Sequence, residues 1–264
     1  MDDEEGTTAE AVRGLYCRVL TQVRRSRLGA PLLDDLLRIG REHASGDIIA
    51  FITADIVAQP NLAQVAEACH ALMGGKPYLA VAGRVDLLRP VESIDSSCDW
   101  FEQLREATKL HGRPHGFSAI DLWIYPKTWA IDPPPFPIGR GGTDNWVVYK
   151  ARTSRVPVVD VTADLLLIHQ WHDKPARKSP RFREEFYECV RLFDNIAENA
   201  MSLLDADMIL RDGQLRRPTG FRRVHSSMSL FRPYRKLLAQ YRRIRKPHIF
   251  RHGACEAGDG GTSP

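Results

Sequence analysis

The sequence contains no apolar run that approaches the ~18–20 residues needed for a bilayer-spanning helix. It also has no apolar stretch behind a basic start, because residues 2–5 are all acidic, so we expect no secretory signal peptide. The five cysteines are scattered, and no two have the short spacing of a zinc or redox motif. These absences predict a cytoplasmic protein with free thiols in a reducing compartment.

Acidic residues become scarce late in the chain. Between Arg211 and Arg251 there are thirteen Lys or Arg residues and one acid, Asp212. The 264 residues, of which 43% are hydrophobic, suffice for one large domain with a sizeable core. We therefore expect a main domain at 1–205, a basic helical extension at 206–251 and a disordered Gly-rich tail at 252–264.

Strand-like apolar runs alternate with helical patterns in the first half of the chain. The runs at 47–53, 78–88 and 120–125 are separated by amphipathic stretches. Residues 47–53 are nearly all apolar, which is typical of a central parallel strand buried on both faces. The alternation predicts an α/β fold with a mostly parallel sheet flanked by helices. Pro180 is expected to open a long amphipathic helix that reaches Leu204.

Asp55 stands just beyond the first of these strand-like runs. In open α/β sheets, ligands bind outside the carboxyl ends of the strands. A carboxylate in this place can hold a divalent metal ion against a diphosphate. The plainer alternative is that Asp55 caps the turn before Pro60.

Two histidines follow a later apolar run. His169 opens the sequence His169-Gln170-Trp171-His172-Asp173. Neutral imidazole is a common ligand for manganese-like ions beside carboxylates. His169 is therefore the second candidate ligand, and its alternative is a structural role at the end of a strand.

Two further carboxylates stand in unusual positions. Asp144 follows a glycine loop and Thr143, a good N-cap, so it is expected in the first turn of a helix, where it can act as a general base or accept from a sugar hydroxyl. The alternative is a helix cap with Trp146 in the core. Asp121 interrupts an apolar run, and a buried unpaired carboxylate is costly. We expect Asp121 to face a polar cavity or an arginine, and the plainer alternative is a structural ion pair.

These pieces occur together in the order of one family. Residues 6–173 resemble bacterial GT-A-type glycosyltransferase-like proteins, which use nucleotide sugars. The segments that carry the resemblance are Gly29–Leu33, Gly46–Ile49, Thr53–Ile56, Gly83–Arg84, Asp121–Trp123, Phe136–Arg140, Asp144–Trp146 and His169–Asp173.

The resemblance implies a GT-A-like, Rossmann-like fold and a transferase that moves a sugar from a nucleotide-sugar donor to a glycan or lipid-linked acceptor. Asp55 and His169 would hold a divalent metal ion, Mn²⁺ or Mg²⁺, against the leaving diphosphate. Asp144 would be the catalytic base in a direct displacement. The implied substrate-binding residues are Arg84, Asp121, Trp123, Arg140, Asn145 and Trp146.

The chain departs from the family pattern in two places. Thr53 stands where the metal-binding motif usually has Asn or Asp, and a hydroxyl is a weaker ligand. The opening βαβ unit that cradles the nucleoside base is not recognisable, with Asp2–Gly6 resembling a segment that follows it, so weak nucleotide binding is expected. The alternative function is therefore a catalytically inactive scaffold that acts as a binding or interaction protein.

The basic segment contains an amphipathic pattern at 230–246. Apolar residues recur at helical spacing, and Lys and Arg fill the remaining positions. Such a helix either packs its apolar face on the domain or binds an anionic membrane surface peripherally. Nucleic acid is not the expected partner.

Overall fold

The computed structural model describes residues 12, 17–20, 22–95, 97–172 and 179–245. The expected tail at 252–264 lies outside these residues, as do Lys246 and residues 2–6, on which the expectation of a missing βαβ unit depends. Within the described residues, no helix is long and apolar enough to cross a bilayer.

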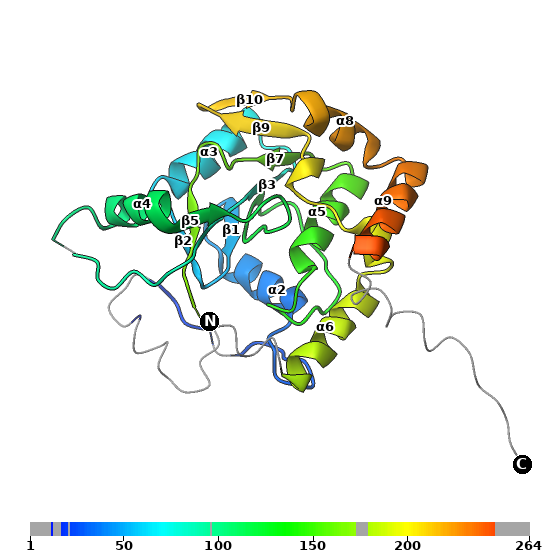
Figure 1. The fold of residues 1–264 in the computed structure, drawn as a ribbon, viewed down its shortest axis with the longest axis horizontal. Helices are drawn as coiled ribbons and strands as arrows, with labels where there is room; N and C mark the ends of the chain where they lie inside the picture. The colour runs from blue at the N-terminus through cyan, green and yellow to red at the C-terminus, as the bar shows by residue number, and fades with distance from the viewer. Residues whose placement is uncertain (1–11, 13–16, 21, 96, 173–178, 246–264) are drawn as a thin grey trace, which may run out of the picture.

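Two mixed sheets form the centre of the molecule (Figure 1). The six-stranded sheet has the order β1-β6-β3-β7-β9-β10, and the four-stranded sheet has the order β2-β8-β4-β5. The strands of the first sheet are β1 (Ile48–Ile52), β3 (Leu79–Ala82), β6 (Leu122–Pro126), β7 (Val158–Asp160), β9 (Met208–Arg211) and β10 (Gln214–Arg216). Those of the second are β2 (Ile56–Ala58), β4 (Val85–Leu87), β5 (Gly112–Pro114) and β8 (Leu167–His169).

The expectation of a mostly parallel sheet is wrong. In the larger sheet, β6 runs antiparallel to both β1 and β3, and only the β3–β7 and β7–β9 pairs are parallel. Nor is β1 a central strand, since among the described residues it pairs with β6 and lies at the edge of that sheet. An apolar run indicates burial by helices on both faces of a strand. It does not reveal whether the strand has a neighbouring strand on each side.

Strand alternation divides the core between the two faces of the larger sheet. Leu79, Val81 and Trp123 pack with helices α2 (Leu33–His43), α5 (Thr143–Thr153) and α6 (Pro180–Leu192). Ala80 and Leu122 pack on the other face with α3 (Leu62–Leu72). Because neighbouring side chains of a strand point to opposite faces, both faces are covered, as an α/β fold requires. Helix α4 (Trp100–His111) packs separately against the smaller sheet.

The single strand expected at 78–88 is divided. β3 ends at Ala82 and β4 begins at Val85, and the two belong to different sheets. Gly83 permits this change of direction in a crowded place, since a Cβ there would lie 2.9 Å from a methyl carbon of Leu203. At this break the chain passes from the larger sheet to the smaller one, and Arg84 lies between the two strands.

The helix expected from Pro180 to Leu204 ends early. Helix α6 stops at Leu192, and Asp194 and Asn195 follow with φ angles of 46° and 54°. Asn and Asp tolerate this left-handed conformation, which separates α6 from the short helix α7 (Ile196–Asn199) and the 3₁₀ turn at Leu203–Asp205.

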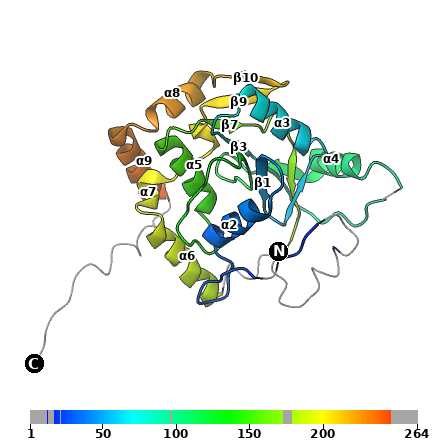
Figure 2. The ribbon, with the colours of Figure 1, turned by 180° about the vertical axis from the view of Figure 1, so that it is seen from behind.

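The C-terminal part of the described chain first completes the larger sheet and only then becomes helical. β9 pairs with β7, and β10 with β9. The domain boundary expected at 205/206 therefore precedes two strands of the main sheet. Helices α8 (Gly220–Met228) and α9 (Arg232–Arg245) follow, one after the other along one edge of the molecule in both views (Figures 1 and 2).

Candidate functional site

Asp55, His169 and His172 form a cluster at the end of β1. Asp55 lies in the turn between β1 and β2, and the antiparallel pairing of β2 with β8 sets Ile56 opposite His169. The Asp55 Oδ2 atom lies 3.1 Å from His169 Nε2 and 3.5 Å from His172 Nε2. One ligand atom from each residue lies within 4.8 Å of the others. The structure thus brings together Asp55 and His169, the two predicted metal ligands.

A second carboxylate, that of Asp86, lies near the ring nitrogen of the buried His169 that does not contact Asp55. β4 runs parallel to β8 with Asp86 opposite His169. The Asp86 Oδ1 atom lies 3.4 Å from His169 Nδ1, and Asp86 Oδ2 lies 2.5 Å from His115 Nδ1. A carboxylate on the far nitrogen of a metal-ligating histidine fixes the orientation of its ring.

Arg84 links this cluster to Asp121. Its Nε donates to Asp86 Oδ1 over 2.9 Å, and one of its terminal nitrogens donates to Asp121 Oδ2 over 2.8 Å. Thr53 also approaches Asp121, because the end of β1 pairs with the start of β6. Of the two surroundings expected for Asp121, an arginine is therefore the one that the structure contains.

Asp144 lies beyond Asp121 in the first turn of α5. Gly142, with φ 83°, precedes this helix in place of the expected Thr143 cap. The backbone N–H of Ile120 donates to Asp144 Oδ2 over 3.3 Å. Burial, together with the negative charge of Asp121, raises the pKa of Asp144 to about 7. A carboxyl group with such a pKa can gain or lose a proton near neutral pH.

Asp55 and Asp86, in contrast, have lowered pKa values. Burial works against ionisation of Asp55, but the Thr53 hydroxyl and the charge of His169 outweigh it and lower the pKa of Asp55. Burial likewise opposes ionisation of Asp86, and a hydrogen bond from His115 with the charge of Arg84 lowers the pKa of Asp86. These two carboxylates are therefore ionised over a wide pH range.

The donor set fits a divalent transition metal ion. Two imidazoles and one carboxylate suit Mn²⁺ and its neighbours better than Mg²⁺, which prefers oxygen ligands. Asp55 and His172 are accessible to solvent, whereas His169 is buried and backed by Asp86. Three protein ligands leave further coordination positions for a substrate.

Four predicted substrate-binding residues lie in internal contacts away from this cluster. Arg140 donates to Glu185 over 2.6 Å, and Asn145 donates to the Met201 carbonyl over 2.6 Å. Trp123 is buried and stacks on Phe51 with ring centroids 4.6 Å apart. Trp146 is buried too and meets the edge of Phe136 in the core.

Sequence reasoning did not assign His172, Asp86 or His115 to the site. His172 stood in the run around His169 and could have been assigned. Asp86 and Arg84 lie two residues apart, as residues on one face of a strand do, which is a weak signal. No sequence pattern pointed to His115, because the pairing of β4 with β5 is what brings it to Asp86.

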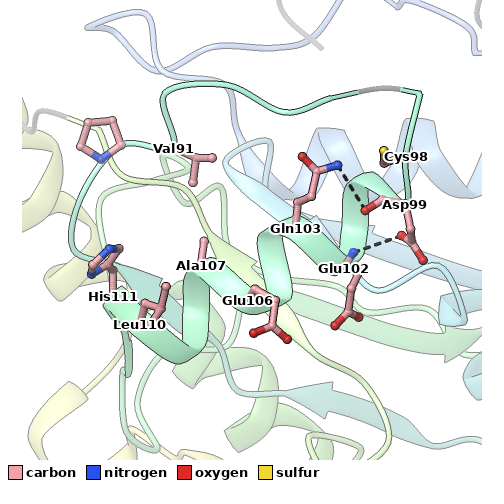
Figure 3. A pocket seen from close by; sticks show the side chains of 10 residues that line it. Val91, Cys98, Asp99, Glu102, Gln103, Glu106, Ala107, Leu110 and His111 are labelled. Atoms are coloured by element: carbon pink, nitrogen blue, oxygen red, sulfur yellow. Dashed lines mark hydrogen bonds between the residues drawn. The ribbon is translucent and has the colours of Figure 1, made fainter.

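A cavity of about 630 Å³ lies elsewhere, along α4 (Figure 3). Its wall combines Glu102 and Glu106 with apolar side chains such as Leu110. Asp99 in this cavity is engaged as the cap of α4, where it accepts from the backbone N–H groups of Phe101 and Glu102. Glu102 and Glu106 are likewise engaged, in ion pairs with Arg105 and Lys109, so we assign the chemistry to the Asp55 cluster instead.

Comparisons with protein-family models, with curated proteins and with solved structures find no match to this chain.

Proposed function

We propose that this protein is a metal-dependent transferase that acts on a nucleotide-sugar donor, built on a variant of the GT-A fold. The observation that carries the proposal is the polar network that runs from the metal-ligand cluster of Asp55, His169 and His172, through Asp86 and Arg84, to Asp121, whose charge in turn acts on Asp144. The two ends of this network offer the two groups that displacement at an anomeric carbon requires, namely a site for the leaving diphosphate and a proton acceptor.

The residues divide these tasks by their electrostatics. Asp55, His169 and His172 would hold the metal ion, which when bound neutralises charge on a diphosphate. Asp86 holds the ring of His169, and Arg84 fixes Asp86 relative to Asp121. These contacts pre-organise the ligands, so less reorganisation is needed when substrate binds.

Asp144 is the proposed base. With its pKa at about 7, it is a stronger proton acceptor than an ordinary carboxylate and is still ionised in an appreciable fraction of molecules at neutral pH. The charge of Asp121 contributes to this raised pKa, which makes Asp121 a positioning and tuning residue for the base. The acceptor is proposed to be a glycan or lipid-linked hydroxyl.

Metal-dependent binding without transfer is the second candidate function. It is favoured by the internal contacts of Trp123, Arg140, Asn145 and Trp146. Residues that already have protein partners contribute less to binding a sugar. In this case the Asp55 cluster would still bind a metal–nucleotide complex, but no product would form.

Release of nucleoside diphosphate from uridine and guanosine diphosphate sugars tests the proposal. We expect Mn²⁺-dependent release by the wild-type chain and a loss of at least about 100-fold in Asp144→Asn, since a general base contributes about 10²–10⁴-fold. Asp55→Asn should show the same loss through weaker metal binding. His111→Ala, which removes an exposed histidine of α4, is the matched control and should keep full activity. Metal-dependent nucleotide binding without any release would favour the second function.

A further inference from the structure

Helices α8 and α9 direct several polar side chains inward and expose several large apolar side chains. In α9, Leu237, Tyr241 and Ile244 follow one another at helical spacing and are between 56% and 78% exposed. In α8, Phe221 and Val224 are 69% and 62% exposed. An amphipathic helix of a globular protein normally buries this stripe. Of the two alternatives for the pattern at 230–246, packing on the domain therefore holds only for part of the apolar face, with Tyr234 and Leu238 partly buried.

The inward face of α9 includes two arginines beside the buried Ala239. Arg242 donates to the carbonyls of Ala197 and Ala200 at the end of α7, with both distances 2.8 Å. Arg235 donates to Asn199 Oδ1 over 3.0 Å. These bonds anchor α9 to α7 with its apolar stripe facing solvent.

The inward face of α8 is polar as well. Arg222 donates to Asp160 Oδ2 over 2.7 Å, and His225 Nε2 lies 3.2 Å from Asp205 Oδ1. The other ring nitrogen of His225 lies 2.9 Å from the hydroxyl of Tyr234 in α9. Both helices are therefore fixed in this orientation by several independent contacts, and the junction residues Leu230 and Phe231 are also exposed.

Positive charge surrounds this apolar surface. A pocket of about 540 Å³ opens between α8, the end of α5 and β7, and Leu230 contributes to its wall. Arg155, Arg217 and Arg223 line it and are exposed. Within the described part of the chain none of the three forms an ion pair, whereas Arg152 at its base is bonded to Asp207. Lys236 and Arg243 add charge beside the stripe of α9.

We propose that α8 and α9 form a docking face for an anionic phospholipid membrane, with the apolar stripe entering the interface and the arginine pocket receiving a headgroup phosphate. Exposed apolar side chains beside Lys and Arg are the pattern of helices that lie in a membrane interface. Arginine binds phosphate with several directed hydrogen bonds. The charge of the face argues against a second copy, which would bring like charges together.

Co-sedimentation of the full chain with vesicles at low salt tests this face. We expect binding to vesicles rich in phosphatidylglycerol and none to pure phosphatidylcholine. Replacing the outward residues (Leu237→Ser, Tyr241→Ser, Ile244→Ser) or the pocket arginines (Arg155→Gln, Arg217→Gln, Arg223→Gln) should each weaken binding at least about tenfold. Ile244→Asp, at the most exposed of these positions, tests the stripe with minimal risk to folding.

Matched controls lie on other surfaces. Leu72→Ser with Leu110→Ser removes exposed apolar groups of α3 and α4, and Lys76→Gln, Arg89→Gln and Arg113→Gln remove exposed charges. Both controls should bind like the wild type. Equal binding by the stripe and pocket variants would overturn the proposal. So would inorganic phosphate binding without vesicle binding, or a wild-type dimer in sedimentation equilibrium that the Ile244→Asp variant abolishes.

Discussion

The carboxyl groups at the two ends of the polar network have pKa values shifted in opposite directions. At one end, His169, His115 and Arg84 surround Asp55 and Asp86, and the pKa values of both acids are lowered. At the other end, burial and the charge of Asp121 raise the pKa of Asp144 to about 7. Acids of one chemical type thus have pKa values shifted in opposite directions because their neighbours differ, which is why we propose a cation site at one end and a proton acceptor at the other.

Arg84 stands between the two ends and is the residue whose loss we expect to matter most for stability. Arg84→Met would leave the partly buried carboxylates Asp86 and Asp121 without their shared partner. Breaking a buried pair in this way costs about 3–5 kcal/mol. Urea unfolding measures the loss, and a change below about 1 kcal/mol would show that the pairs are not coupled to the fold.

The matched control for Arg84 is Arg105→Met. Arg105 pairs with Glu102 on the exposed face of α4, where both side chains are accessible. Exposed pairs contribute about 0–1 kcal/mol. A similar loss in the two variants would mean that burial is not the reason for the effect.

Asp144→Asn should stabilise the protein at high pH. Because the folded-state pKa of Asp144 is raised, its favourable contribution is complete below the unfolded pKa and is lost as pH rises to about 7. The Asn variant does not ionise at this position, so it does not lose this contribution to stability. Its advantage over the wild type should therefore grow between pH 4 and pH 7, by up to about 4 kcal/mol at 1.36 kcal/mol per pKa unit.

Unfolding of both proteins in urea at several pH values checks this prediction. Asp132→Asn, in the proline-rich turn before α5, is the control. An advantage that stays constant with pH would show that Asp144 titrates in the folded state as it does in the unfolded chain.

His115→Gln should produce the smallest effect, and with the opposite pH dependence. The hydrogen bond from His115 helps to lower the pKa of Asp86, so its contribution is present above the unfolded pKa of Asp86 and is lost as pH falls through the folded value. We expect the variant to be about 1 kcal/mol less stable near pH 6 and to converge with the wild type in acid. Two parallel curves across this range would contradict the role of His115.

The sequence allowed the α/β class and the meeting of Asp55 with His169 to be predicted, because strand ends and residue types were both readable. The antiparallel β6 and the edge position of β1 were not predictable, since pairing depends on contacts between distant segments. His115 reaches Asp86 only through such a pairing. The glycosyltransferase function, the cytoplasmic location and the roles of the substrate-binding residues stay predictions.

Helices α2 and α9 illustrate a further limit. Both are amphipathic, and α2 buries apolar side chains of one face, among them Leu33 and Leu37. In α9, Arg235 and Arg242 take inward positions, where Arg235 donates to Asn199 Oδ1 and Arg242 donates to the carbonyls of Ala197 and Ala200. Hydrophobic periodicity finds the two faces of a helix, but the hydrogen-bonding needs of the neighbouring element decide which face is buried.

The central claim is that Asp55, His169 and His172 bind a metal ion that in turn holds a nucleoside diphosphate. Calorimetric titration of uridine and guanosine diphosphate sugars into the wild-type chain, with Mn²⁺ and then with excess chelator, tests it most directly. We predict that one of these donors binds with Mn²⁺ present, that chelator abolishes the binding, and that His172→Ala weakens it at least about tenfold while His111→Ala does not. Binding that persists in chelator, or that is equal in the two histidine variants, would contradict the account.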